Sequence, residues 1–171
     1  MRLCFVCLGN ICRSPAAEAL TQHLLDERGE DDRPGDLAGL QVSSAGTGPW
    51  HVGEEPHPHM LTEARRRGIP VDHRGYQFST QDFADVDLIV AMDAGNVDDL
   101  AGLAPDESAR VKIVRLGSFA PGDDGHRWAG EEGDDVPDPY GQPPRAFAEM
   151  FDQLEPACRG LLDWLGSGRA R

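Results

Sequence analysis

The chain has 171 residues, and its 39% of apolar residues, together with 20 glycines, is typical of one globular domain and excludes a disordered or collagen-like chain. Its formal net charge of −14 argues against binding to nucleic acid or to an anionic membrane surface. The longest N-terminal apolar run, residues 3–8, is too short for a membrane span or a secretory signal, so we expect a cytoplasmic protein.

Apolar patterns of strand and helix type alternate along the chain. The predicted strands are residues 2–6, 40–45, 87–92 and 111–116, and the predicted helices are 15–25, 59–67 and 147–165. Pro156 should kink the last helix or split it in two. The alternation predicts an α/β fold: a small doubly wound parallel sheet of about four strands in the order 2-1-3-4, with helices on both faces. We expect a single domain over residues 1–166 and a short tail over 167–171.

Two segments rich in Gly, Asp and Glu, residues 26–36 and 121–135, carry most of the acidic excess. Each contains a proline, and both are expected to be solvated loops.

The first predicted strand leads into residues 7–15 (CLGNICRSP), and a helix starts at once. Pro15 suits the first turn of that helix and Ser14 is a natural N-cap. A loop that enters a helix N-terminus directs several unpaired N–H groups to one point, where a tetrahedral oxyanion can bind. Arg13 adds a planar, permanently charged fork for two oxygens of the same anion. Because the sequence has neither a Walker lysine nor a dinucleotide fingerprint, we expect a phosphate that is not part of a nucleotide.

Cys7 lies at the base of this phosphate-binding loop. The N–H groups and the Arg13 guanidinium that attract a phosphate also favour a thiolate, and Ser14 can donate a hydrogen bond to the sulfur. A nucleophile is thus expected directly below an anion that it can attack, which is the arrangement of covalent phosphoryl transfer.

A metal site is not expected. Cys4 and Cys7 are three residues apart on a strand and therefore point to opposite faces, which disfavours a shared zinc ion and places Cys4 in the core. The histidines at positions 51, 57 and 59 are interpreted as surface-loop residues. We expect neither a metal nor another cofactor.

The sequence resembles the low-molecular-weight protein tyrosine phosphatase family over nearly its whole length. The motifs that carry the resemblance are residues 7–15, SSAGT at 43–47, WHVG at 50–53, HR at 73–74, AMD at 91–93 with Asn96, and VPDPY at 136–140. The resemblance implies that Cys7 is the nucleophile, Arg13 the phosphate clamp and Asp138 the general acid, with Ser14 assisting the sulfur.

The resemblance also implies substrate contacts and loop supports. The implied substrate contacts are Leu8, Gly9, Asn10, Ile11, Cys12, Trp50 and Tyr140, and the implied supports of the loop are Asn10, Ser44 and His73. Trp50 and Tyr140 would wall a slot for a phenyl ring. Cys12 would either form a reversible disulfide with the nucleophile or pack as a small side chain under the loop, and the sequence leaves both open. Tyr140 is followed by Gly141 where the family often has a second tyrosine, which leaves the rim more open.

Asp138 lies between two prolines, which carry its carboxyl on a stiff arm. Repulsion from a bound phosphate and a thiolate would keep this carboxyl protonated, ready to protonate a leaving phenolate and later to accept a proton from water. Asp134 and Asp135 are weaker candidates for this role because neither is followed by proline.

Three other functions compete with tyrosine phosphatase. A protein-arginine phosphatase of the same superfamily tends, by resemblance, to carry Thr where this chain has Ile11. A thiol-dependent arsenate reductase needs a downstream cysteine pair, and this chain has only Cys158. A catalytically silent phosphate-binding module would be expected to lose Cys7 or Asp138. We therefore expect a monomeric enzyme that hydrolyses phosphotyrosine in proteins, or a small aryl phosphate, through a phosphocysteine intermediate and releases inorganic phosphate.

Overall fold

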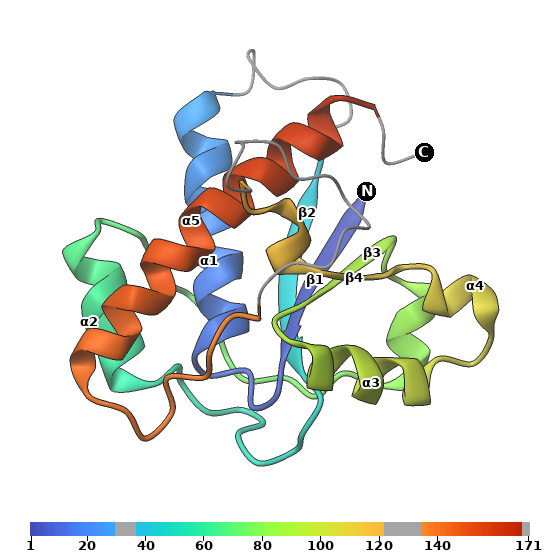
Figure 1. Cartoon of the computed structure of the whole chain (residues 1–171), viewed down its shortest axis with the longest axis horizontal. Coiled ribbons are helices and arrows are strands. Elements are labelled where there is room, and N and C mark those ends of the chain that lie inside the picture. The colour runs from blue at the N-terminus through green and yellow to red at the C-terminus, as the bar shows by residue number, and fades with distance from the viewer. Residues whose placement is uncertain (30–36, 122–134, 169–171) are drawn as a thin grey trace.

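Four parallel strands form the single sheet of the computed structural model, which describes residues 1–29, 37–121 and 135–168 (Figure 1). The strands are β1 (Arg2–Cys7), β2 (Gln41–Gly46), β3 (Leu88–Ala91) and β4 (Ile113–Arg115). Their spatial order is β2-β1-β3-β4, and every neighbouring pair is parallel, which confirms the predicted sheet. The two acidic segments of the sequence lie largely outside the described residues.

Helices cover both faces of the sheet, as predicted. They are α1 (Arg13–Arg28), α2 (Pro58–Arg66), α3 (Ala94–Leu103), α4 (Glu107–Arg110) and α5 (Pro144–Gly166), with 3-10 helices η1 (Thr80–Ala84) and η2 (Leu116–Phe119). The sequence pattern did not predict α3 and α4, because both are short and lack a clear apolar stripe. Their starts are fixed instead by aspartate caps: Asp93 accepts from Asn96 N at 2.7 Å, and Asp106 accepts from Ala109 N at 2.9 Å.

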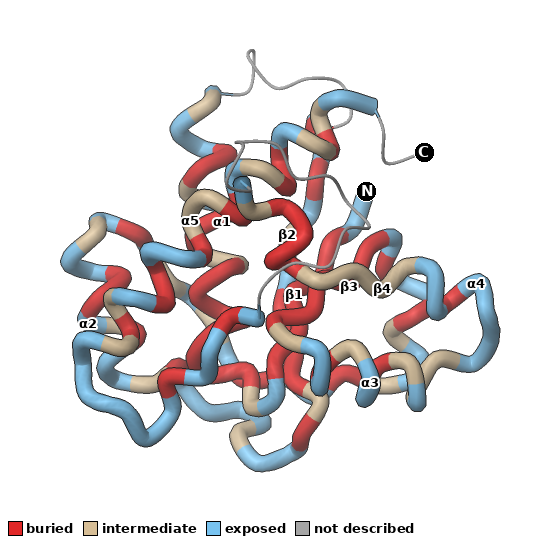
Figure 2. Tube along the Cα trace, in the orientation of Figure 1, coloured by how far each residue is buried: buried red, intermediate tan, exposed pale blue. Residues whose placement is uncertain are grey.

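Alternate side chains of β1 enter two separate cores. Phe5 and Cys7 pack with α1, α2 and α5, whereas Cys4 and Val6 pack on the opposite face with η1, α3 and α4. Figure 2 shows the buried residues running through the sheet and along the inward faces of α1 and α5. The predicted core position of Cys4 is confirmed, and the sheet itself separates it from Cys7.

The helix α5 passes through Pro156 without a break, so of the two outcomes predicted there, a kink or a split, the split is wrong. Proline removes the N–H that would bond to the carbonyl of Asp152, four residues earlier. Asp152 is exposed, so water can satisfy that carbonyl, and buried Phe151 and Leu161 hold the helix to the sheet on either side of the proline. No helix in the described part of the chain is long and apolar enough to cross a membrane.

The loops that follow β1 and β2 are fixed to each other at the lower edge of the molecule in Figure 1. The ladder between the two strands continues past their ends, because Thr47 N donates to Cys7 O and Gly48 N donates to Leu8 O, both at 2.9 Å. The phosphate-binding loop predicted at residues 7–15 is therefore held at the carboxyl ends of the strands, where open α/β sheets bind ligands.

Candidate active site

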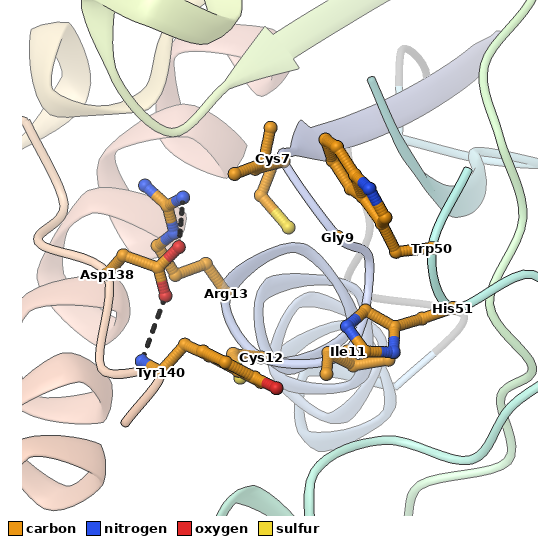
Figure 3. Close-up of a pocket in the computed structure, with 10 residues that line it drawn as sticks. Cys7, Gly9, Ile11, Cys12, Arg13, Trp50, His51, Asp138 and Tyr140 are labelled. Carbon is orange, nitrogen blue, oxygen red and sulfur yellow. Dashed lines mark hydrogen bonds and ion pairs between the residues drawn. The ribbon is translucent and has the colours of Figure 1, made fainter. Parts of the chain in front are cut away.

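A cavity of about 400 Å³ opens at this edge of the sheet. Its lining combines the loop after β1, the loop after β2 and the segment before α5: Cys7, Leu8, Gly9, Ile11, Cys12, Arg13, Trp50, His51, Asp138 and Tyr140 (Figure 3). All of these residues except His51 were selected from the sequence. The cavity is of the size expected for a small-molecule or side-chain site.

The first turn of α1 differs from the prediction at Ser14. The helix starts at Arg13 with Cys12 in the N-cap position, so Ser14 lies inside the helix and is not its cap. The Ser14 hydroxyl is held by residues distant in sequence: it accepts from Asn10 Nδ2 at 2.9 Å and lies 3.1 Å from Ala45 O, to which it can donate. Capping preferences consider only the local chain, whereas these partners come from the loop and from β2.

Hydrogen-bond donors surround the sulfur of Cys7, as expected. Asn10 N donates to Cys7 Sγ at 3.3 Å, and Ser14 Oγ lies 3.0 Å from the same sulfur. The Ser14 hydroxyl has a single proton, which can be donated either to Ala45 O or to the Cys7 sulfur; a thiolate can only accept, so Ser14 is the donor when Cys7 is ionised. The thiol is at the floor of the cavity, and the residue is only 2% exposed.

Asn10 fixes the shape of the loop. Its backbone has φ 55°, a left-handed conformation that Asn tolerates better than most residues. Its Oδ1 accepts from Tyr76 N at 2.8 Å and lies 3.0 Å from His73 Nε2, while its Nδ2 donates to Ser44 Oγ at 2.9 Å. The sequence assigned Asn10 both to substrate contact and to loop support. In the structure the Asn10 side chain makes hydrogen bonds that support the loop, and the residue does not line the cavity.

Glu18 completes this support and was not selected from the sequence. Its Oε2 accepts from Ser44 Oγ at 2.6 Å and lies 3.1 Å from His73 Nδ1. A single acid within a helix gives no signal of such a role, because one of its partners comes from β2 and the other from a loop distant in the sequence.

The Arg13 guanidinium is almost fully buried, with 3% of its side chain exposed. Its Nη1 donates to Asp93 Oδ2 at 2.5 Å and to Val136 O at 3.0 Å, and its Nη2 donates to Asp138 Oδ2 at 2.8 Å. Burial alone would lower the pKa of Arg13, but the charges of Cys7 and Asp138 and the contact with Asp93 outweigh it and raise that pKa. Among the described residues nothing accepts a hydrogen bond from Arg13 Nε.

The carboxyl of Asp138 reaches the cavity from the segment between Pro137 and Pro139. Its Oδ2 accepts from Arg13, and its Oδ1 accepts from Tyr140 N at 3.0 Å (Figure 3). Of the two rival acids, Asp135 does not line the cavity and is bound by other groups, and Asp134 lies outside the described residues.

Aromatic rings flank the mouth of the cavity. Trp50 and Tyr140 are 63% and 58% exposed, and the Trp50 ring lies so close to Gly48 that a Cβ added there would be 1.8 Å from it. His51 stands on the Trp50 side in Figure 3, with its Nδ1 held 2.7 Å from Glu54 Oε2. His51 does lie in a partly exposed loop, as interpreted from the sequence, but it also lines the cavity, which the sequence did not indicate.

The other histidines of this region do not reach the cavity. His57 caps α2 by accepting from His59 N at 3.2 Å and stacks on Phe147 with ring centroids 4.8 Å apart. Burial, followed by the charges of His59 and His51, lowers the pKa of His57. In the described part of the chain no group of three or more His, Cys, Asp or Glu residues is arranged to hold a metal ion.

All four cysteines are free thiols in the structure. Cys12 lies in the cavity lining, and burial, together with the charges of Asp138 and Cys7, raises its pKa. Burial also raises the pKa of Cys4 and that of Cys158 to about 12 each.

Comparison with known proteins identifies the family. The family model described as low molecular weight phosphotyrosine protein phosphatase matches residues 2–170. The chain belongs to this family. The low molecular weight protein-tyrosine-phosphatase of Streptomyces coelicolor is 42% identical to this phosphatase over 162 residues, which is 94% of this chain and 91% of that protein.

Solved structures agree with this assignment of the phosphatase. A protein tyrosine phosphatase from Entamoeba histolytica, crystallised with Hepes in its active site, superposes with a TM-score of 0.83 and 34% identity over 99% of both chains. The arginine phosphatase YwlE superposes with a TM-score of 0.81 over the whole of both chains, but at 24% identity this likeness shows the fold alone.

Proposed function

We propose that this tyrosine phosphatase works by covalent catalysis, with Cys7 as nucleophile, Arg13 as phosphate clamp and Asp138 as general acid and base. The observation that carries the proposal is the placement of Cys7 Sγ, with Ser14 Oγ at 3.0 Å and Asn10 N–H at 3.3 Å, on the floor of a cavity that Arg13 and Asp138 also line. These donors stabilise a negative sulfur at the point where a phosphate would bind.

In the first step, Cys7 Sγ attacks phosphorus and the bond from phosphorus to the aryl oxygen breaks. Asp138 gives its proton to the leaving oxygen, because a free phenolate is a poor leaving group at neutral pH. Arg13 and the loop N–H groups stabilise the charge on the equatorial oxygens. The product of this step is phosphocysteine.

In the second step, a water molecule attacks the phosphocysteine and Asp138 accepts its proton. The sulfur–phosphorus bond breaks, Cys7 is restored as a thiolate and inorganic phosphate leaves. Ser14 supports the sulfur as a leaving group by donating a hydrogen bond to it.

A substrate phosphate must displace Asp138 from Arg13. Arg13 Nη2 is occupied by Asp138 in the structure, whereas Nε has no partner among the described residues. We propose that Nε and Nη2 bind two phosphate oxygens, while Asp93 and Val136 O keep hold of Nη1 and so keep the guanidinium oriented.

The walls of the cavity favour an aryl group over a guanidinium. Trp50 and Tyr140 present ring surface at the mouth, and Ile11 presents only an apolar side chain to the cavity. A site that must select phosphoarginine needs a polar partner for the guanidinium, so Ile11 disfavours that alternative. An Ile11→Thr variant tested on phosphotyrosine and phosphoarginine peptides should shift the ratio of kcat/KM values toward phosphoarginine.

Further parts of the proposal concern the setting of the enzyme. All of the groups proposed for catalysis come from one chain, so the proposed mechanism requires no second subunit and we propose a monomeric enzyme. The nucleophile must remain a free thiol, which a reducing compartment such as the cytoplasm preserves.

Cys12 lines the same cavity as Cys7, which supports a reversible disulfide between the two sulfurs after oxidation.

The test is hydrolysis of an aryl phosphate, in the presence of a chelator, by the wild type, Cys7→Ser and Asp138→Ala. Cys7→Ser should abolish turnover. Asp138→Ala should lose on the order of 10²–10⁴ in rate for substrates with basic leaving groups. Acid quenching of the wild type followed by mass spectrometry should find the phosphoryl group on the peptide that contains Cys7. Turnover that survives Cys7→Ser would refute the mechanism.

A further inference from the structure

The arm that carries the general acid is fastened at its start by one carboxylate. The arm comprises residues 135–140, part of the orange stretch that leads from the grey trace toward α5 in Figure 1. At its first residue, Asp135 Oδ1 accepts from Arg115 Nη1 at 2.9 Å and from Ala94 N at 3.0 Å. One oxygen therefore joins the arm both to the end of β4 and to the start of α3.

Both contacts have a clear physical basis. The N–H groups in the first turn of a helix have no partner within the helix, and Ala94 N, at the start of α3, is one of them. Asp93 satisfies Asn96 N, and Asp135 satisfies Ala94 N, so each carboxylate serves a different N–H of the same turn. The Arg115 side chain is 20% exposed and that of Asp135 is 49% exposed. An ion pair that is partly exposed to solvent contributes little to the free energy of folding. Removing the pair should therefore change the position of the arm more than the stability of the protein.

The chain between Asp135 and Asp138 transmits the position of the one residue to the other. Val136 N donates to Met92 O at 2.9 Å, and Val136 O accepts from Arg13 Nη1 at 3.0 Å. The prolines at 137 and 139 each fix one backbone dihedral, and the residue before each is restricted as well. Because the chain between Asp135 and Asp138 has so few free dihedrals, a shift at Asp135 displaces the carboxyl of Asp138.

We propose that Asp135, held by Arg115 and by Ala94 N, is a positioning residue for the general acid Asp138. The inference rests on the proposed function, in which Asp138 transfers the proton to the leaving group. Asp135 itself does not line the cavity and acts only through the arm.

The leaving group of the substrate distinguishes positioning from a general effect. Asp135→Ala should lower kcat/KM roughly 10- to 100-fold for aryl phosphates whose phenols are weakly acidic, because a misplacement of about 1 Å can cost on the order of 10² in rate. It should change kcat/KM much less for phosphates of strongly acidic phenols, which leave without a proton. Arg115→Met should give the same pattern, and Asp135→Asn a smaller effect, because its side-chain oxygen can still accept from Ala94 N.

A double-mutant cycle makes the inference specific. Once Asp138 is replaced by Ala there is no acid to position, so adding Asp135→Ala should lower the rate no further. The matched control is Asp152→Ala, which removes a similar pair, Asp152 Oδ1 in α5 to Nη2 of Arg67, the residue after α2, at 2.7 Å. This variant should leave the leaving-group dependence unchanged.

The inference would be overturned by additive effects in the cycle, or by equal losses for acidic and weakly acidic phenols. If Asp135→Ala does not fold, as judged by circular dichroism, Asp135→Asn and Arg115→Met decide by the same criteria. If Asp138→Ala hydrolyses aryl phosphates with the kcat/KM of the wild type, the proposed function is overturned as well. If Asp138→Ala is impaired as expected but Asp135→Ala hydrolyses these phosphates with the kcat/KM of the wild type, only the role of Asp135 is overturned.

Discussion

Replacement of Asp138 by Asn should change turnover and anion affinity in opposite directions. In the structure the Asp138 carboxylate accepts from Arg13 Nη2 at 2.8 Å and so occupies a donor that a phosphate needs. Asp138→Asn removes the competing charge and also removes its repulsion of an incoming dianion. The variant should therefore hydrolyse aryl phosphates poorly and yet bind an inert oxyanion more tightly than the wild type.

The geometry sets the size of the gain. Two unit charges at 2.8 Å attract by about 6 kcal/mol at an effective dielectric of about 20, and by about 1.5 kcal/mol in water. Because 40% of the Asp138 side chain is exposed, the lower figure applies, and partly exposed pairs are usually worth about 1 kcal/mol or less. A gain of about 1 kcal/mol corresponds to roughly fivefold tighter binding.

Isothermal titration calorimetry with tungstate, a tetrahedral dianion at neutral pH, measures this gain directly. Asp152→Asn is the control for net charge, because it removes one negative charge far from the cavity and should bind tungstate as the wild type does. Tungstate binding by Asp138→Asn that is equal to, or weaker than, that of the wild type would refute the idea that the general acid competes for Arg13.

Three more predictions concern the sulfur, the loop and a distant ion pair. Cys7→Ser should lose turnover but still bind tungstate in calorimetry, because the Arg13 clamp remains. Asn10→Ala should lower the free energy of unfolding by about 1–3 kcal/mol in a urea titration, because it leaves buried partners unsatisfied, and it should also lower kcat. The hydrogen bond from Arg66, aided by Arg67 and opposed by burial, lowers the pKa of Glu63 from 4.5 to about 2. The full difference in pKa corresponds to about 3 kcal/mol, but the Arg66 side chain is 64% exposed and solvent screens the pair. Glu63→Gln should therefore cost about 2 kcal/mol above pH 4.5, and the difference from wild type should vanish as the pH falls toward 2.

The sheet and its ligand-binding edge could be predicted from the sequence because they depend on local patterns. Apolar runs such as residues 87–92 mark buried strands, and their alternation with helices leaves few topologies for a parallel sheet. The helices α3 and α4 were missed because their aspartate caps, rather than an apolar stripe, define them. Whether Pro156 would kink or split the last helix could not be decided from the sequence, because the cost of a missing hydrogen bond depends on whether the freed carbonyl can reach water.

The site shows the same division between local and tertiary information. Cys7 and Arg13 could be selected from the loop motif and Asp138 from the resemblance to the family, and the structure brings all three to one cavity. Neither Glu18 nor His51 could be selected for the site in this way, because their contacts there depend on which distant segments of the chain fold against them. Ser14 illustrates both: its place beside the sulfur follows from the motif, whereas its hydrogen bonds to Asn10 and Ala45 arise only from the tertiary fold.

All four thiols are buried, but the surroundings of Cys7 differ from those of the other three, which makes the protein a convenient target for covalent probes. Cys4 and Cys158, with pKa values raised to about 12, stay protonated at physiological pH, and the pKa of Cys12 is raised as well. Cys7 lines the open cavity and has hydrogen-bond donors at its sulfur, so a mild electrophile such as a chloroacetamide should add to the chain once, at Cys7. An aryl-bearing electrophile would gain further selectivity from Trp50 and Tyr140, so a small library could be ranked by intact mass alone.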